Sequence, residues 1–148
     1  MKWLQLLTVF TLTALGAMHA SAGQKTVGDY EFHYSVFNSM FVQPEVARHY
    51  GIVRARDNAV LNIAVRKRLP DGGTKAQRAM VSGSSSDLVR RYDLSFKEVE
   101  EQDAIYYLAQ FRHGKKETRD FRLQIQPDPN AAPYRLEFND ELFQEQDQ

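Results

Sequence analysis

Apolar and polar side chains alternate with a period of two along most of the chain after residue 22. The alternation is clearest in five runs, at residues 30–36, 61–65, 92–96, 121–125 and 134–138. A period of two is typical of β-strands that bury one face and expose the other. Residues 104–111 are apolar on both faces, which indicates a strand in the interior of its sheet. The pattern therefore predicts a protein made mainly of β-strands.

Other segments are shorter or less regular. Residues 52–55 and 76–82 are weaker strand candidates, and the Gly- and Ser-rich residues 82–86 are interpreted as a loop or bulge. One short helix is predicted from Pro44 to Tyr50, because proline suits a first helical position and the following Gly51 suits a left-handed cap. Turn residues separate the strands at intervals of roughly 10 to 15 residues, which is typical of sandwiches and barrels.

These elements predict an all-β, immunoglobulin-like antiparallel sandwich of about seven or eight strands with one short helical turn. A small open β-barrel is the alternative arrangement of the same strands. The inward-facing positions of the strands predict a core that consists of Tyr30, Phe32, Tyr34, Leu61, Ile63, Val65, Leu94, Phe96, Ile105, Tyr107, Phe111, Phe121, Leu123, Ile125, Leu136 and Phe138.

The first 22 residues have the features of a signal peptide. Lys2 supplies a positive charge, residues 3–17 form a short uncharged apolar stretch, and Ala20-Ser21-Ala22 offers a small-x-small cleavage site. We therefore expect export to the periplasm, a signal peptide at 1–22 and a single domain at 23–148. An uncleaved N-terminal anchor is the alternative.

Composition narrows the possible functions. The chain of 148 residues has 19 basic and 19 acidic side chains, and this balance argues against nucleic acid as a partner. Cysteine is absent, which excludes thiol catalysis, thiolate metal sites and lipid attachment at a lipobox cysteine. An exported domain without disulfides must be stabilised by its apolar core.

The candidate metal ligands after residue 22 are His33, His49, His113, Met40 and Met80. No two of them have the i, i+2 or i, i+4 spacing that places two ligands on one element. The sequence therefore predicts neither a metal site nor a cofactor. A copper- or zinc-handling protein built from these side chains is an alternative, because exported proteins often handle such metals.

Hydrolytic chemistry has weak support. Ser84, Ser85 and Ser86 follow a glycine, but the nucleophile elbow Gly-x-Ser-x-Gly is absent. The acidic residues of 98–103 are interpreted as a solvated turn between two strands rather than as paired catalytic carboxylates. No catalytic residue is predicted, and a small hydrolase is the third hypothesis.

The clearest candidate for a functional surface lies where the first clear strand ends and the short helix begins. His33, Asn38, Ser39 and Tyr50 bring hydrogen-bonding groups to this crossover, and loops at strand ends are common binding sites in sandwiches. A structural interpretation competes with this one, because Asn38 or Ser39 would also cap backbone amides there.

The segment DYEFHYSVFNSMFVQPEVARHYGI, followed by AVLNIAVRK and DAIYYLAQFRHG, resembles a bacterial family catalogued as domain of unknown function 4426 (DUF4426). The resemblance extends over about residues 28–143. It rests on positions that include His33, Asn38, Pro44, Tyr50 and Asn62. Met40 and Val42 depart from the expected Thr and Leu. The resemblance implies an exported, immunoglobulin-like β-sandwich and implies no activity.

Together these observations predict a non-enzymatic accessory or binding protein of the bacterial cell envelope. Its partner would be an envelope protein or an anionic envelope polymer, contacted through strand edges or loop ends. The basic clusters at residues 66–68, 90–91 and 115–116 are an anion-binding face on one interpretation and solvated surface on the other.

Overall fold

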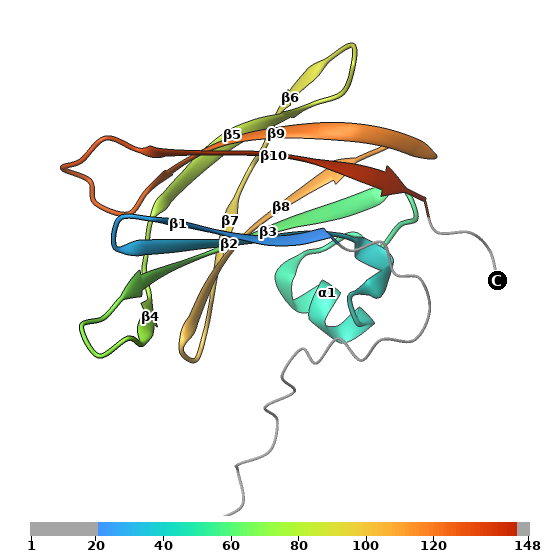
Figure 1. Ribbon diagram of the computed structural model, residues 1–148. Helices are drawn as coiled ribbons and strands as arrows, with labels where there is room; N and C mark the ends of the chain where they lie inside the picture. Colours follow the sequence, from blue (N-terminus) through green and yellow to red (C-terminus); the bar gives the residue numbers. More distant parts are fainter. Residues whose placement is uncertain (1–20, 145–148) are drawn as a thin grey trace, which may run out of the picture.

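The computed structural model describes residues 21–144 (Figure 1). Residues 1–20 of the predicted signal peptide lie outside the described residues. The predicted cleavage point after Ala22 falls inside the first strand, β1 (Ser21–Val27), so that Gly23 to Val27 would remain paired with the next strand.

The chain forms two antiparallel sheets, here named sheet A and sheet B. Sheet A has the order β1-β2-β3-β8-β7, with β4 also paired to β3, and sheet B has the order β10-β9-β5-β6. The bounds of sheet A are β2 Tyr30–Asn38, β3 Asn58–Arg68, β4 Thr74–Ala76, β7 Lys97–Glu101 and β8 Ala104–Arg112. Those of sheet B are β5 Met80–Ser86, β6 Arg91–Asp93, β9 Lys116–Gln126 and β10 Tyr134–Phe143.

The two sheets stack face to face as an all-β sandwich, which confirms the predicted fold class (Figure 1). The core lies between them, and every residue of the predicted core is either buried in it or packed against it. Stacked rings connect the sheets at one side, where the centroids of Tyr34 in sheet A and Phe138 in sheet B lie 4.2 Å apart. Phe138 also stacks on Phe121 of its own sheet, at 4.8 Å. β8 lies between β3 and β7, as its two apolar faces predict.

The crossover from β2 to β3 contains a 3₁₀ turn at Ser39–Phe41 and the helix α1 at Pro44–Tyr50. The helix has the predicted bounds and is followed by the cap residue Gly51, whose φ of 70° is the left-handed conformation that glycine adopts without strain. Val42 and Ala47 of the crossover are buried, and so is Val60 on the face of β3 that points away from the core. The crossover therefore packs against the outer face of sheet A, on the side opposite sheet B (Figure 1).

The structure corrects the interpretation of residues 82–86 as a loop or bulge, because they lie within β5, between β9 and β6. Gly83 is required there, since a Cβ at this position would collide with the carbonyl oxygen of Arg122. Ser85 faces inward and is fully buried, where its hydroxyl accepts a hydrogen bond from Arg119. Close sheet packing thus overrides a composition that is typical of loops.

The predicted strand at 92–96 is also wrong as a single element. Tyr92 belongs to β6 in sheet B, whereas the next strand, β7, lies in sheet A. The chain crosses between the sheets at residues 94–96, and Leu94 and Phe96 still pack against the core from this connection. Alternation predicted the burial of these two side chains but not the change of sheet.

The acidic run that was predicted as a turn lies largely in β7. Glu98 and Glu100 accept hydrogen bonds from Arg78 at 2.5 Å and 2.9 Å, which connects β7 to the segment between β4 and β5. The hydrogen bond with Glu98, followed by the charges of both carboxylates, raises the pKa of Arg78. The turn itself is limited to Gln102 and Asp103.

Candidate binding site at the crossover

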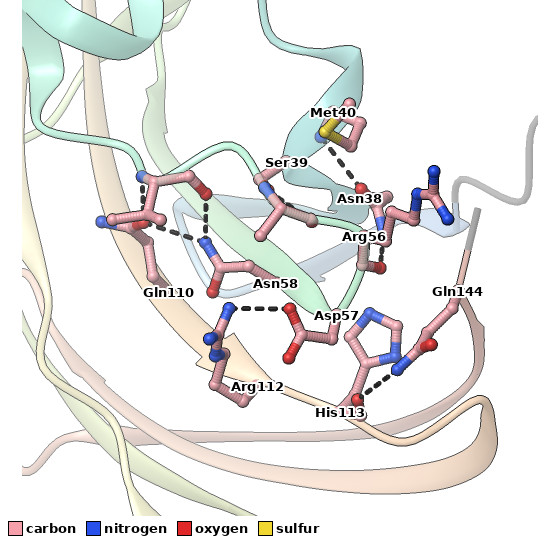
Figure 2. A network of polar contacts seen from close by, with 12 residues as sticks. Asn38, Ser39, Met40, Arg56, Asp57, Asn58, Gln110, Arg112, His113 and Gln144 are labelled. Carbon is pink, nitrogen blue, oxygen red and sulfur yellow. Dashed lines mark hydrogen bonds and ion pairs between the residues drawn. The ribbon is translucent and has the colours of Figure 1, made fainter. Parts of the chain in front are cut away.

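Asn38 and Ser39, at the end of β2, fix the start of the crossover through their side chains (Figure 2). The Asn38 carboxamide accepts a hydrogen bond from the Met40 amide at 2.9 Å and donates one to the Arg56 carbonyl at 2.6 Å. The Ser39 hydroxyl accepts from the Ala55 amide and donates to the Ala55 carbonyl, both at 3.0 Å. Asn38 and Ser39 are buried, so these bonds satisfy polar side chains that have little access to water.

Gln110 on β8 fixes the middle of the same segment. Its Oε1 accepts from the Val53 amide at 2.8 Å and from Asn58 Nδ2 at 3.1 Å, and its Nε2 donates to the Gly51 carbonyl at 2.9 Å. Asn58 Nδ2 also donates to the Val53 carbonyl at 2.6 Å. Residues 52–55, predicted as a weak strand, are therefore a loop whose backbone bonds to side chains rather than to a neighbouring strand.

The last part of the network joins this loop to β8 and the end of β10. Arg112 forms an ion pair with Asp57 at 2.7 Å, and the His113 amide donates to the Asp57 carbonyl at 2.9 Å. Gln144 Nε2 donates to the His113 carbonyl at 3.2 Å (Figure 2). The His113 ring is buried, and its Nδ1 lies 2.9 Å from the Gly114 carbonyl oxygen.

This network presents an apolar and basic surface at one end of the sandwich. Val53 is 61% exposed, and Arg54 and Arg56 are exposed in the same loop. Arg112 of β8 is joined to this loop by its ion pair with Asp57. We name Val53, Arg54, Arg56 and Arg112 the crossover platform. Arg112 pairs with Asp57, and Arg54 donates to the Met40 carbonyl at 3.1 Å. Guanidinium groups bind carboxylates and phosphates in a two-pronged geometry. The surface is therefore suited to an anionic ligand.

The structure brings together two of the four predicted site residues. Asn38 and Ser39 belong to the network, where they cap the backbone as the structural interpretation describes. His33 lies on the opposite face of β2, roughly 17 Å along the strand from Asn38, with its Nε2 3.1 Å from Glu31. Tyr50 ends α1, where its carbonyl accepts a hydrogen bond from Lys97 at 3.1 Å. A ligand-binding role for these four residues stays a prediction.

The residues suggested for metal binding and hydrolysis lie in unlike surroundings. His33 contacts Glu31, His49 lies against the Tyr50 ring, and His113 is buried below the platform. Within residues 21–144, no three His, Cys, Asp or Glu side chains are grouped so that they could hold a metal ion. Ser85 is buried against Arg119, which is a hydrogen-bond donor and not a general base.

Sequence reasoning missed the basic members of the platform. Arg54, Arg56 and Arg112 come from two segments more than fifty residues apart, which only the tertiary structure brings together. The local signal is the succession of charged and turn-forming residues at 54–58, which overlaps the weak strand predicted at 52–55.

The fold and this site define an all-β sandwich with a fixed polar crossover at one end. The model of the family described as domain of unknown function (DUF4426) matches residues 24–145, and the chain belongs to this family. A crystal structure of a DUF4426 family protein from Pseudomonas aeruginosa is 34% identical, with a TM-score of 0.74. The match covers 84% of this chain and 97% of that chain.

Two structures of FetP from uropathogenic Escherichia coli are similar in fold. FetP isolated after expression in the periplasm is 10% identical with a TM-score of 0.61, over 86% of this chain and 98% of that chain. A copper-bound variant of FetP is 11% identical with a TM-score of 0.59, over 87% of this chain and 94% of that chain. No curated protein matches the sequence. In the part of the chain that the structure describes, no helix is long and apolar enough to cross a membrane.

Proposed function

We propose that this protein is a non-enzymatic accessory protein of the bacterial cell envelope that binds an anionic envelope protein or polymer through the crossover platform. The proposal rests on one observation. Val53, Arg54 and Arg56 are exposed on a loop whose backbone is held in one conformation by hydrogen bonds from side chains at the ends of β2, β3 and β8. A loop ordered before binding loses less conformational entropy when the ligand arrives.

The polar side chains of this site support binding rather than catalysis. Asn38, Ser39 and Gln110 use their hydrogen-bonding groups on backbone atoms of the loop. The exposed groups are guanidinium and aliphatic side chains, which recognise anions and apolar surface but do not move protons near neutral pH. The description of the family assigns no activity.

The periplasm is the proposed location, with the signal peptide at residues 1–22 and a single domain at 23–148. The support comes from Lys2, the apolar stretch and the Ala20-Ser21-Ala22 site. The fold neighbour FetP was expressed in the periplasm, which agrees with this location.

Charge reversal on the platform tests the proposal. The wild-type protein, an Arg54→Glu variant and an Arg135→Glu variant would be immobilised and exposed to a detergent extract of the cell envelope. Arg135 is exposed on β10, outside the platform, and supplies the same change of charge. We expect Arg54→Glu to lower recovery of the bound component about tenfold, because one charge-assisted contact contributes roughly 1.5 to 3 kcal/mol. Equal recovery by all three proteins would contradict the proposal, provided that their melting temperatures agree.

Metal handling is the second candidate, and the observation that favours it is the copper-bound FetP variant with the same fold. In this chain the ligands would come from His33, His49, His113, Met40 and Met80. Titration with copper and zinc, followed by His→Ala substitution, separates the two candidates. A dissociation constant of about 1 μM or tighter that is lost on substitution would favour metal handling over the platform.

A further inference from the structure

The hairpin formed by β5 and β6 has an ordered turn of four residues, Asp87 to Arg90. The Asp87 amide donates to the Arg90 carbonyl at 3.0 Å, and the Asp87 carboxylate accepts from the amides of Val89 and Arg90, both at 2.7 Å. The Tyr92 hydroxyl donates to the other carboxylate oxygen at 3.3 Å. These bonds, that of the Val89 amide above all, lower the pKa of Asp87. The turn therefore has one defined conformation.

The tip of this turn carries two apolar side chains that contact water. Leu88 is fully exposed and Val89 is 86% exposed, and they are the most exposed large hydrophobic residues within 21–144. Hairpin turns favour Gly, Asn, Asp, Ser and Pro for conformational reasons, and a leucine and a β-branched valine satisfy none of them. Neither side chain serves the turn or the core, so both are free to contact an external apolar environment.

The base of the hairpin is firmly attached to the sandwich. Arg119 is buried, donates to Ser85 on β5 at 3.0 Å and to the Arg112 carbonyl on β8 at 3.0 Å, and lies 5.0 Å from the centre of the Tyr92 ring. Figure 1 shows the hairpin rising above sheet B, on the side of the molecule away from α1. A tip fixed in this way cannot fold back to bury Leu88 and Val89.

From the tip towards the base of the hairpin, the side chains change in the same order as the layers of a lipid surface. Leu88 and Val89 are apolar, Arg90 and Arg91 are exposed cations, and Tyr92 is an aromatic residue that is 39% exposed. Apolar residues enter the acyl region, cations pair with lipid phosphates, and tyrosine is enriched where headgroups begin. Three carboxylates lie near these cations. Asp87 is part of the turn, where its carboxylate accepts hydrogen bonds from the Val89 and Arg90 amides. By strand register, Asp120 lies opposite Ser86, which also pairs with Arg91, and Asp93 lies opposite Ser84, nearer the base of the hairpin.

We propose that this hairpin docks the protein reversibly on an anionic phospholipid bilayer, with Leu88 and Val89 inserted to the level of the headgroups and Arg90 and Arg91 on the phosphates. A bilayer accommodates a convex tip of this kind without a matching pocket, whereas a protein partner would need one. Two apolar side chains and two cations give weak binding, which suits a contact that forms and breaks.

A spectroscopic label at the tip tests this directly, because the chain contains no cysteine and a single one can be placed at will. Full-length Val89→Cys protein would carry a small spin label and be mixed with vesicles of phosphatidylethanolamine and phosphatidylglycerol. The matched control carries the label at Val53→Cys, another exposed valine. When vesicles are added, we expect the collision rate between the label at position 89 and a water-soluble relaxant to fall about tenfold. The collision rate of the label at position 53 should stay unchanged.

Two further measurements test whether Leu88 and the anionic lipid are responsible for the protection of position 89. Leu88→Asp in the labelled protein should weaken the protection at position 89 about tenfold, because the burial of leucine is lost. Vesicles of phosphatidylcholine alone should give no protection. A label at 89 that stays as accessible as the label at 53 would overturn the proposal, and so would protection that requires an acidic protein fraction instead of vesicles.

Discussion

The crossover and the β5–β6 hairpin both display exposed apolar and basic residues, but they are built in opposite ways. The crossover is fixed along its length, since Asn38, Ser39, Asn58 and Gln110 bond its backbone from three strands. The hairpin is attached at its base by Arg119 and is ordered at its tip only by its own Asp87.

This difference separates the effects of mutation on folding from the effects on binding. Substitution inside the crossover network or at Arg119 removes bonds from buried groups, so it lowers the free energy of unfolding. The side chains of Val53, Leu88 and Arg90 are exposed, so we expect their substitution to change binding and to leave the free energy of unfolding nearly unchanged. Substitution of Arg54 also removes its exposed hydrogen bond to the Met40 carbonyl. The distinction would be wrong if substitutions at the buried positions and at the exposed positions lowered the free energy of unfolding equally.

The largest expected effect is that of Arg119→Met at the base of the hairpin. The change leaves Glu117 without its cation and leaves the Ser85 hydroxyl and the Arg112 carbonyl without their donor. Arg119 is buried and Glu117 is partly exposed. The loss of the ion pair together with the two hydrogen bonds of a buried guanidinium costs about 3 kcal/mol in the free energy of unfolding. Urea denaturation measures this cost, with Arg135→Met on the surface of β10 as the matched control. A cost below about 1 kcal/mol would mean that Arg119 does not anchor the hairpin.

A smaller loss is expected for Ser39→Ala in the crossover. The Ser39 side chain is fully buried. Removal of its hydroxyl leaves the Ala55 amide without its acceptor and the Ala55 carbonyl without its donor. We expect the free energy of unfolding to fall by about 2 kcal/mol, measured by thermal or urea denaturation. Ser95→Ala, at an exposed position, should change it by less than about 0.5 kcal/mol. Equal effects of the two substitutions would remove the claim that the crossover is fixed from within.

The smallest effect concerns Asp87 and is confined to the turn. Its folded pKa is lowered from the ordinary 3.8, so the support that its carboxylate gives to the turn is complete above that value. The support is lost as the pH falls through the lowered pKa. We expect the amides of Val89 and Arg90 to shift together in this acid range in NMR spectra, while the amides of Val53 and Ala55 stay unchanged. Asp87→Ala should remove the transition, and its persistence in that variant would contradict the assignment.

The alternation of apolar residues was sufficient to predict the sandwich and its core, because burial of one strand face leaves a local pattern. It failed at Ser82 to Ser86 and at Leu94 to Phe96, where the pairing partner or the change of sheet is set by residues far away in the chain. The same limit applies to the site. The bond from Asn38 to Met40 is local and was anticipated as a cap, whereas the partners at Ala55, Arg56 and Gln110 depend on tertiary structure.

Site-specific photocrosslinking in living cells tests the central claim most directly, namely that the crossover platform binds an envelope component. A photoreactive amino acid would replace Val53 on the platform and, as the matched control, Thr118 on the exposed face of β9. The account predicts a discrete crosslinked product from position 53 that is absent from position 118 and lost when Arg54→Glu is added. No product at position 53, or the same product from both positions, would contradict it.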